Sequence, residues 1–221
     1  MQRIDKIGLE IEGGWNAGNL PNASPGICSS DPSVNFASDS YGIEAKEYQS
    51  SPTGSLLELT DWVRRIYPPH TNGTCGIHVH VSLKSPMNYA RIIDKRFEAF
   101  FDEELNTWAK GRITNKHFWA RLNGENKFCK KGWNPEEQMR QLSKGAGVRW
   151  TQWNFCWGVR KTAECRVLPT FKKPEVAIMT ITKVVKIVED YLALSPIALA
   201  VNHRVVDPDD DIPDELLELM R

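Results

Sequence analysis

The sequence predicts an α+β fold in which helices cover an antiparallel sheet. Three short segments, 4–14, 43–49 and 75–83, alternate apolar and polar residues or run apolar, which is typical of strands. Two longer segments, 85–110 and 174–194, carry apolar residues at helical spacing. Helices and strands do not alternate regularly along the chain, so this order of elements favours an antiparallel sheet over a parallel one.

The strands are delimited by turn residues. In "IGLEIEGG" the apolar positions alternate with Gly8, Glu10 and Glu12, and the Gly-Gly pair predicts the end of the strand. Residues 16–42 are rich in Asn, Ser, Pro and Gly, so we expect a long irregular connection there. Two late segments, "VRWTQWNFCWGV" and "TAECRVLPT", predict a pair of strands joined around Arg160 and Lys161.

The helices are predicted from their apolar stripes and their breakers. Residues 55–67 form the first helix, which a Pro-Pro pair ends. Residues 85–110 form one long amphipathic helix that a glycine stops, and residues 174–194 form another that begins at a proline.

The segment 111–148 is basic, aromatic and contains glycine, so we expect loops with a short helix near 135–144. Trp119 and Trp133 in this segment are the better candidates for stacking on a planar ligand. The other tryptophans are expected in the core, as most are in folded proteins, among them Trp150, Trp153 and Trp157.

Charge is balanced over the 221 residues, with 28 basic and 28 acidic side chains. A duplex nucleic-acid binder usually shows a basic excess, so the composition argues against one. The balance is uneven along the chain, since the segment 81–173 is basic and both flanking segments are acidic. A basic middle between acidic flanks suits a site that binds metal ions and a phosphorylated ligand together.

Five cysteines, none at CxxC spacing, argue against a disulfide framework. The opening residues lack the apolar stretch of a signal peptide, and no uncharged run is long enough for a transmembrane helix. We therefore expect a cytoplasmic protein without a membrane partner.

Three strands each carry a pair of polar residues at i and i+2. Residues two apart in a strand face the same side, so each pair projects together. Carboxylates suit hard cations such as Mg²⁺, histidine completes such a set, and arginine neutralises phosphoryl oxygens. Taken singly, each pair also fits an ordinary polar face or a surface ion pair. The pairs are Glu10 with Glu12, His78 with His80, and Glu164 with Arg166.

Over residues 4–171 the motifs "IGLEIEGG", "DPSV", "IEAKEYQSSP", "CGIHVHVSL", "VRWTQWNF" and "TAECRVLPT" follow in order. In this combination the sequence resembles the amidoligase family of the carboxylate–amine ligase superfamily, which includes glutamine synthetase and glutamate–cysteine ligase. The resemblance implies a glutamine synthetase-like catalytic fold, a curved antiparallel sheet with helices packed on its outer face. It implies one catalytic domain over 1–206, followed by an acidic tail over 207–221.

The resemblance also implies the ligands of two or three Mg²⁺ or Mn²⁺ ions, with Glu44 as a weaker candidate. By position these ligands are Glu10, Glu12, Glu47, His78 and Glu164.

Nucleotide and phosphoryl contacts follow from the same resemblance. His80 would lie beside the ATP phosphates, and Arg166 would steady the phosphoryl group. Arg149, ahead of Asn154, would bind nucleotide or acyl phosphate. Catalytic roles thus fall on Arg166, Glu47 and Arg149. Cys75 is expected to pack in the sheet and not to act as a nucleophile.

The implied reaction is ATP-dependent amide formation from a small-molecule or peptide carboxylate and an amine or ammonia, through an acyl phosphate. The sequence leaves open the identity of both substrates and the oligomeric state. Three alternatives also stay open: a metal-dependent hydrolase using the same Glu/His cluster, a nucleotide- or peptide-binding module without catalysis, and a nucleic-acid modifier that uses the basic middle.

Overall fold

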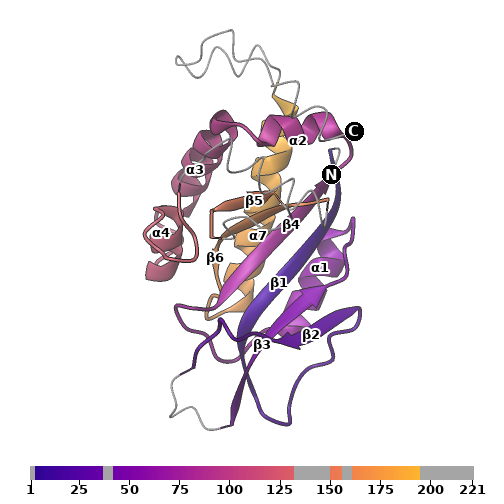
Figure 1. Cartoon of the computed structure of the whole chain (residues 1–221), viewed down its shortest axis with the longest axis vertical. Coiled ribbons are helices and arrows are strands. Elements are labelled where there is room, and N and C mark those ends of the chain that lie inside the picture. The colour runs from indigo at the N-terminus through magenta and orange to yellow at the C-terminus, as the bar shows by residue number, and fades with distance from the viewer. Residues whose placement is uncertain (1–2, 37–41, 132–149, 156–160, 195–221) are drawn as a thin grey trace.

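Six strands form one open antiparallel sheet in the computed structural model, which describes residues 3–36, 42–131, 150–155 and 161–194. The spatial order is β2-β3-β1-β4-β6-β5, and every neighbouring pair is antiparallel (Figure 1). The predicted α+β class is confirmed. The strands are β1 (Ile4–Asn16), β2 (Gly26–Ser30), β3 (Ile43–Ser50), β4 (Gly76–Leu83), β5 (Trp153–Phe155) and β6 (Ala163–Pro169).

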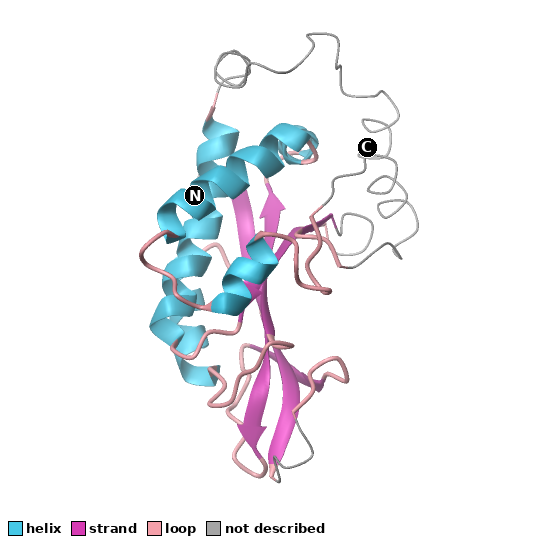
Figure 2. Cartoon of the chain, turned by 90° about the vertical axis from the view of Figure 1, so that its left-hand side faces the viewer, coloured by secondary structure: helices cyan, strands magenta, loops and turns pink. Residues whose placement is uncertain are grey.

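Most of the helices gather on one side of the sheet (Figure 2). None of the helices in the described ranges combines the length and the apolar character needed to cross a membrane. The helices are α1 (Leu56–Ile66), α2 (Pro86–Ile92), α3 (Lys95–Ala109), α4 (Lys116–Leu122) and α7 (Pro174–Ala193).

Alternation along β1 and β4 separates the core from the polar face. Leu9, Ile11 and Val79 are almost fully buried and belong to the same core cluster as Val184 and Val188 of α7. Each such side chain contributes about 1.5–3 kcal/mol when it leaves water. This burial fixes which face of the central strands meets the helices, and the polar residues between them must face the other way.

The predicted end of the first strand at the Gly-Gly pair is wrong. β1 continues through Gly13 and Gly14 to Asn16, paired with β3. A Cβ on Gly13 would lie 2.4 Å from the Cβ of Pro68, and one on Gly14 would lie 2.6 Å from the Cγ2 of Ile43. The two glycines therefore permit close approach within a strand and do not form a turn.

The helix predicted over 85–110 is two helices. α2 ends at Ile92 and α3 begins at Lys95. Between them Asp94 accepts a hydrogen bond from the backbone N–H of Arg96 at 2.8 Å, which caps the start of α3. The apolar spacing continues across the break, so periodicity alone cannot reveal it.

Two elements lie where loops were expected. β2 falls within 16–42, and it escapes prediction because it is an edge strand whose side chains are mostly exposed and lack alternation. α4 falls within 111–148 and is capped by Asn115, whose side chain accepts from two backbone N–H groups. The short helix expected near 135–144 and the acidic tail over 207–221 lie outside the described residues.

Candidate functional site

The register of the central strands brings the three predicted polar pairs onto one face. Directly paired residues in an antiparallel sheet project to the same side. The polar face of β1, β3, β4 and β6 is therefore a continuous surface of carboxylates and imidazoles. The paired positions are Glu10 with His78, Glu12 with Glu47, and His80 with Glu164.

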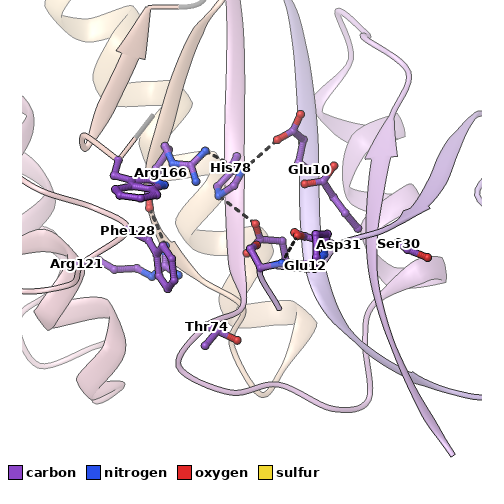
Figure 3. Close-up of a pocket in the computed structure, with 13 residues that line it drawn as sticks. Glu10, Glu12, Ser30, Asp31, Thr74, His78, Arg121, Phe128 and Arg166 are labelled. Atoms are coloured by element: carbon purple, nitrogen blue, oxygen red, sulfur yellow. Dashed lines mark hydrogen bonds and ion pairs between the residues drawn. The ribbon is translucent and has the colours of Figure 1, made fainter. Parts of the chain in front are cut away.

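His78 lies at the centre of this cluster and is 2% exposed. Its Nδ1 lies 3.1 Å from Oε2 of Glu10 and 3.3 Å from Oε1 of Glu164. Its Nε2 lies 3.6 Å from Oε1 of Glu12. Figure 3 shows the imidazole of His78 between the side chains of Glu10 and Glu12. One ring thus contacts carboxylates from two strands.

The second histidine and the arginine flank the centre. Nε2 of His80 lies 3.4 Å from Oε1 of Glu10, and its Nδ1 lies 3.2 Å from Oγ1 of Thr162. Nη1 of Arg166 donates to Oε1 of Glu164 at 2.5 Å. The other oxygen of Glu164 accepts from Nδ2 of Asn154 at 3.0 Å. These bonds hold Glu164 and Arg166 in fixed orientations.

Charge in the cluster is unevenly compensated. Burial works against ionisation of Glu10, but hydrogen bonds and charge from His78 and His80 outweigh it and hold the pKa of Glu10 well below its usual range. Glu47 shows the opposite balance, because burial and the nearby charge of Glu10 raise its pKa. On the Glu47 side of the cluster, ionisation is thus opposed by burial and by the charge of Glu10, and a bound cation would offset both effects.

A cavity of about 620 Å³ opens over this surface. It is lined by acidic residues, by hydroxyl-bearing residues and by basic and aromatic residues. The acidic ones are Glu10, Glu12, Asp31 and Glu47; the hydroxyl-bearing ones are Ser30, Ser33 and Thr74; and the basic and aromatic ones are Arg121, Arg166, Phe128 and Trp150.

Three groups of donor atoms could each hold a metal ion, with the atoms of each group within 4.8 Å of one another. Glu10 and Glu47 each belong to two groups, so neighbouring ions could share them. Carboxylate oxygens with one imidazole suit Mg²⁺ or Mn²⁺. The groups are Glu10 with Glu47 and His78; Glu10 with His80 and Glu164; and Glu12 with Asp31 and Glu47.

Two charged cavity residues, Asp31 and Arg121, were not predicted as site residues from the sequence. Asp31 opens the motif "DPSV" directly after β2, and its Oδ1 accepts from the N–H of Ser33 at 2.7 Å. Arg121 comes from α4 and is 1% exposed. Its Nη1 and Nη2 donate to the carbonyls of Arg166 and Cys75, each at 3.2 Å. The motif could have indicated Asp31, whereas nothing distinguishes Arg121 among the basic residues of its segment.

Among the predicted site residues, the structure collects Glu10, Glu12, Glu47, His78, His80, Glu164 and Arg166. Glu44 is not with them, because it lies three residues from Glu47 on the opposite face of β3 and pairs with Lys46 at 2.9 Å. Arg149 lies outside the described residues, as do Trp133 and Trp157.

The expected role of Cys75 agrees with its environment. Its side chain is fully buried, and this burial raises the pKa of the thiol to about 11. Trp153 is 5% exposed and lies in the core as predicted. Trp150 does not, since it is 54% exposed at the cavity. Trp119 packs edge-on against Phe118.

No model of a known protein family matches the chain, and no curated protein matches it. The fold and the cluster by themselves define an α+β protein with a candidate metal centre on the polar face of its sheet.

Proposed function

We propose that the protein is an amidoligase of the carboxylate–amine ligase superfamily, with a glutamine synthetase-like catalytic fold. It would phosphorylate a carboxylate with ATP and then join the acyl group to an amine or ammonia. One observation carries the proposal: polar pairs from β1, β4 and β6 meet in one buried cluster, with Arg166 beside it and an open cavity above it.

The donor set fits divalent cations. Five carboxylates converge there, from Glu10, Glu12, Asp31, Glu47 and Glu164, and only Arg121 and Arg166 face them as guanidinium groups among the described residues. These two guanidinium groups, with the imidazoles of His78 and His80, do not outnumber the carboxylates, and burying carboxylates without enough positive charge is costly. Bound Mg²⁺ or Mn²⁺ ions, two or three in number, would supply that charge and neutralise phosphate oxygens.

Side chains of the protein would bind the phosphoryl group and transfer the proton. Arg166 is fixed by Glu164 and reaches the cavity, which suits it to steady a phosphoryl group in flight. Its planar guanidinium can bind two phosphate oxygens at once. His80, buried beside Glu10 and Thr162, would lie near the same phosphates. Glu47 is the least buried of the four glutamates and would accept the proton of the attacking amine.

The reaction balances in two steps. A carboxylate oxygen of the substrate attacks the γ-phosphorus of ATP, and the bond to the bridging oxygen breaks, so ADP leaves with the electron pair. The amine nitrogen then attacks the acyl carbon, the acyl–oxygen bond breaks, and inorganic phosphate leaves. The amine gives up one proton as the amide forms.

Two measurements test the proposal. ATP together with Mg²⁺ or Mn²⁺ is expected to raise the melting temperature more than either ligand alone, because a ligand that binds only the folded state stabilises it. With hydroxylamine as the amine and a panel of amino acids, polyamines and peptides, the true carboxylate is expected to give a hydroxamate and ADP. Formation of AMP and pyrophosphate would contradict γ-phosphoryl transfer. Metal stabilisation without any ATP effect would favour a metal-dependent hydrolase.

A further inference from the structure

An aromatic pair forms part of the cavity wall. The rings of Phe128 and Trp150 both line the cavity and meet edge to face, with centroids 6.3 Å apart and planes at 84°. Trp150 is 54% exposed, so a large apolar surface faces the opening. Aromatic side chains are normally buried more deeply, and an exposed one beside a cavity is a candidate for ligand contact. We call Phe128 and Trp150 the aromatic rim.

The aromatic rim is tied by hydrogen bonds to the strand that bears Arg166. The carbonyl of Trp150 accepts from the N–H of Lys130 at 2.6 Å, and the carbonyl of Lys130 accepts from the N–H of Gln152 at 3.0 Å. The carbonyl of Gln152 in turn accepts from the N–H of Arg166 at 2.9 Å.

The side chain of Gln152 anchors the same segment to α4. It is 1% exposed, and its Nε2 donates to the carbonyls of Arg121 and Leu122 at 3.1 and 2.7 Å. The backbone that carries Trp150 is thus held against the elements that carry both arginines of the cavity.

The two arginines offer more than their present bonds use. The Nε atoms of Arg121 and Arg166 are buried and have no hydrogen-bond partner within the described part of the chain. Leaving a buried donor unpaired is costly, so an anion that accepts hydrogen bonds from these Nε atoms would be stabilised at this wall. Arg166 also stands next to the candidate metal ligands through Glu164. A polyphosphate would therefore be held between this wall and the carboxylates.

The opposite wall has different chemistry. Figure 3 shows Arg121, Arg166 and Phe128 on one side of His78, with Asp31 and Ser30 on the other. Rings are therefore available on the arginine side, and the hydroxyl group of Ser30 is available beside Asp31. The flat face of a base suits rings, whereas a polar acyl substrate suits hydroxyl groups.

Resting on the proposed function, we infer that the aromatic rim stacks against the nucleobase of the nucleoside triphosphate. The base then lies beyond the arginines, and the carboxylate and amine substrates enter on the side of Asp31 and Ser30. Trp150 and Phe128 determine that the phosphate donor is a nucleotide and not inorganic polyphosphate. Every base presents a π-face, so stacking sets this preference without reading the identity of the base.

Calorimetric titration of the full chain with ATP and, separately, with inorganic tripolyphosphate tests this inference, each with Mg²⁺ and without a carboxylate substrate. The variants are Trp150→Ala and Phe128→Ala. Leu57→Ala is the matched control, because Leu57 is also an exposed apolar side chain, at 71%, and lies on α1 away from the cavity. Melting curves of the metal-free proteins establish that each variant is folded.

We expect Trp150→Ala to weaken ATP binding roughly five- to a hundredfold, as the loss of base stacking does in other sites, and to leave tripolyphosphate binding unchanged. Trp150→Phe is expected to restore part of the ATP affinity because it restores a ring. Phe128→Ala is expected to follow Trp150→Ala, and Leu57→Ala to match the wild type.

Three outcomes would overturn the inference. If the ATP affinity is unchanged in both rim variants, the base does not stack on these rings, and the proposed function is unaffected. An equal loss of ATP and tripolyphosphate would mean that the rim acts through the arginines. If the wild-type protein binds neither ligand, the proposed function fails together with the inference.

Discussion

The backbone N–H of Gly76 donates to Oε2 of Glu12 at 2.6 Å, so the first residue of β4 holds a carboxylate that belongs to β1. The missing side chain of Gly76 matters equally. A Cβ there would lie 3.1 Å from that same Oε2, 3.1 Å from Nη1 of Arg121 and 3.2 Å from Nε2 of His78. Three functional groups therefore converge on a position where a Cβ would have to displace its neighbours by a few tenths of an ångström.

Gly76→Ala is expected to weaken Mn²⁺ binding while the protein stays folded. The new methyl group would press on Glu12 and His78 together, and overpacking of this kind costs about 1–3 kcal/mol. Calorimetric titration with Mn²⁺ measures the effect. Gly8→Ala on β1 is the control, because its Cβ would meet its nearest neighbour, the Cβ of His80, at an ordinary 3.8 Å. Equal Mn²⁺ affinities in the two variants would show that the site tolerates the displacement.

Thr170 joins the same two strands from the end of β6. Its Oγ1 lies 2.7 Å from the carbonyl oxygen of Glu12 and 3.0 Å from that of Gly76. Thr170→Val keeps the shape but removes the hydroxyl, so we expect the free energy of unfolding to fall by about 1–3 kcal/mol. Urea denaturation measures it. Thr182→Val removes an exposed hydroxyl that bonds within α7 and is expected to be nearly neutral; similar losses in both would refute a special role for Thr170.

Arg121 connects α4 to the strand ends below the cavity. Arg121→Met would leave the carbonyls of Cys75 and Arg166 without their guanidinium donor, at about 1–3 kcal/mol for each buried group left unpaired. We expect lower stability in urea and a weaker response to tripolyphosphate. Arg112→Met is the control, since Arg112 is exposed and donates to a carbonyl of its own helix region. If Arg121→Met is as stable as the wild type, the cost of burying the guanidinium charge equals the free energy that its hydrogen bonds contribute.

The polar pairs were predictable because their chemistry and their period of two are both visible in the sequence. Glu10 with Glu12 and His78 with His80 each needed only the alternation of one strand. Their mutual register is set by pairing between distant segments, so the distance between Glu10 and His78 had to be observed. Contact partners this far apart in sequence leave no local signal.

The unpredicted parts share a physical cause. β2 and α4 are short, and tertiary contacts decide such elements more than local preference does. Asp31 and Arg121 depend on these two elements for their positions, so both were missed as site residues. Trp150 was assigned to the core by composition, whereas its neighbourhood places it at the cavity opening.

The last prediction separates a metal ligand from a phosphoryl contact. Glu164 and Arg166 leave β6 on the same face and contact each other at 2.5 Å. Glu164→Gln is expected to weaken Mn²⁺ binding, because a neutral amide withdraws a charge that the cation needs. Arg166→Lys is expected to keep Mn²⁺ affinity and to lower turnover about a hundredfold or more, because lysine keeps the charge but loses the planar fork.

A purely structural ion pair would behave differently, because its loss would lower stability in both variants and leave turnover per folded molecule nearly unchanged. Mn²⁺ affinity, ADP formation and melting temperature, measured on the same two preparations, distinguish the cases. Glu164 is almost fully buried beside His78, so its variant also tests whether the imidazole keeps its position without that carboxylate. Wild-type turnover in both Glu164→Gln and Arg166→Lys would contradict the proposed roles of these two residues. Neither metal binding nor the positioning of the phosphoryl group would then depend on them.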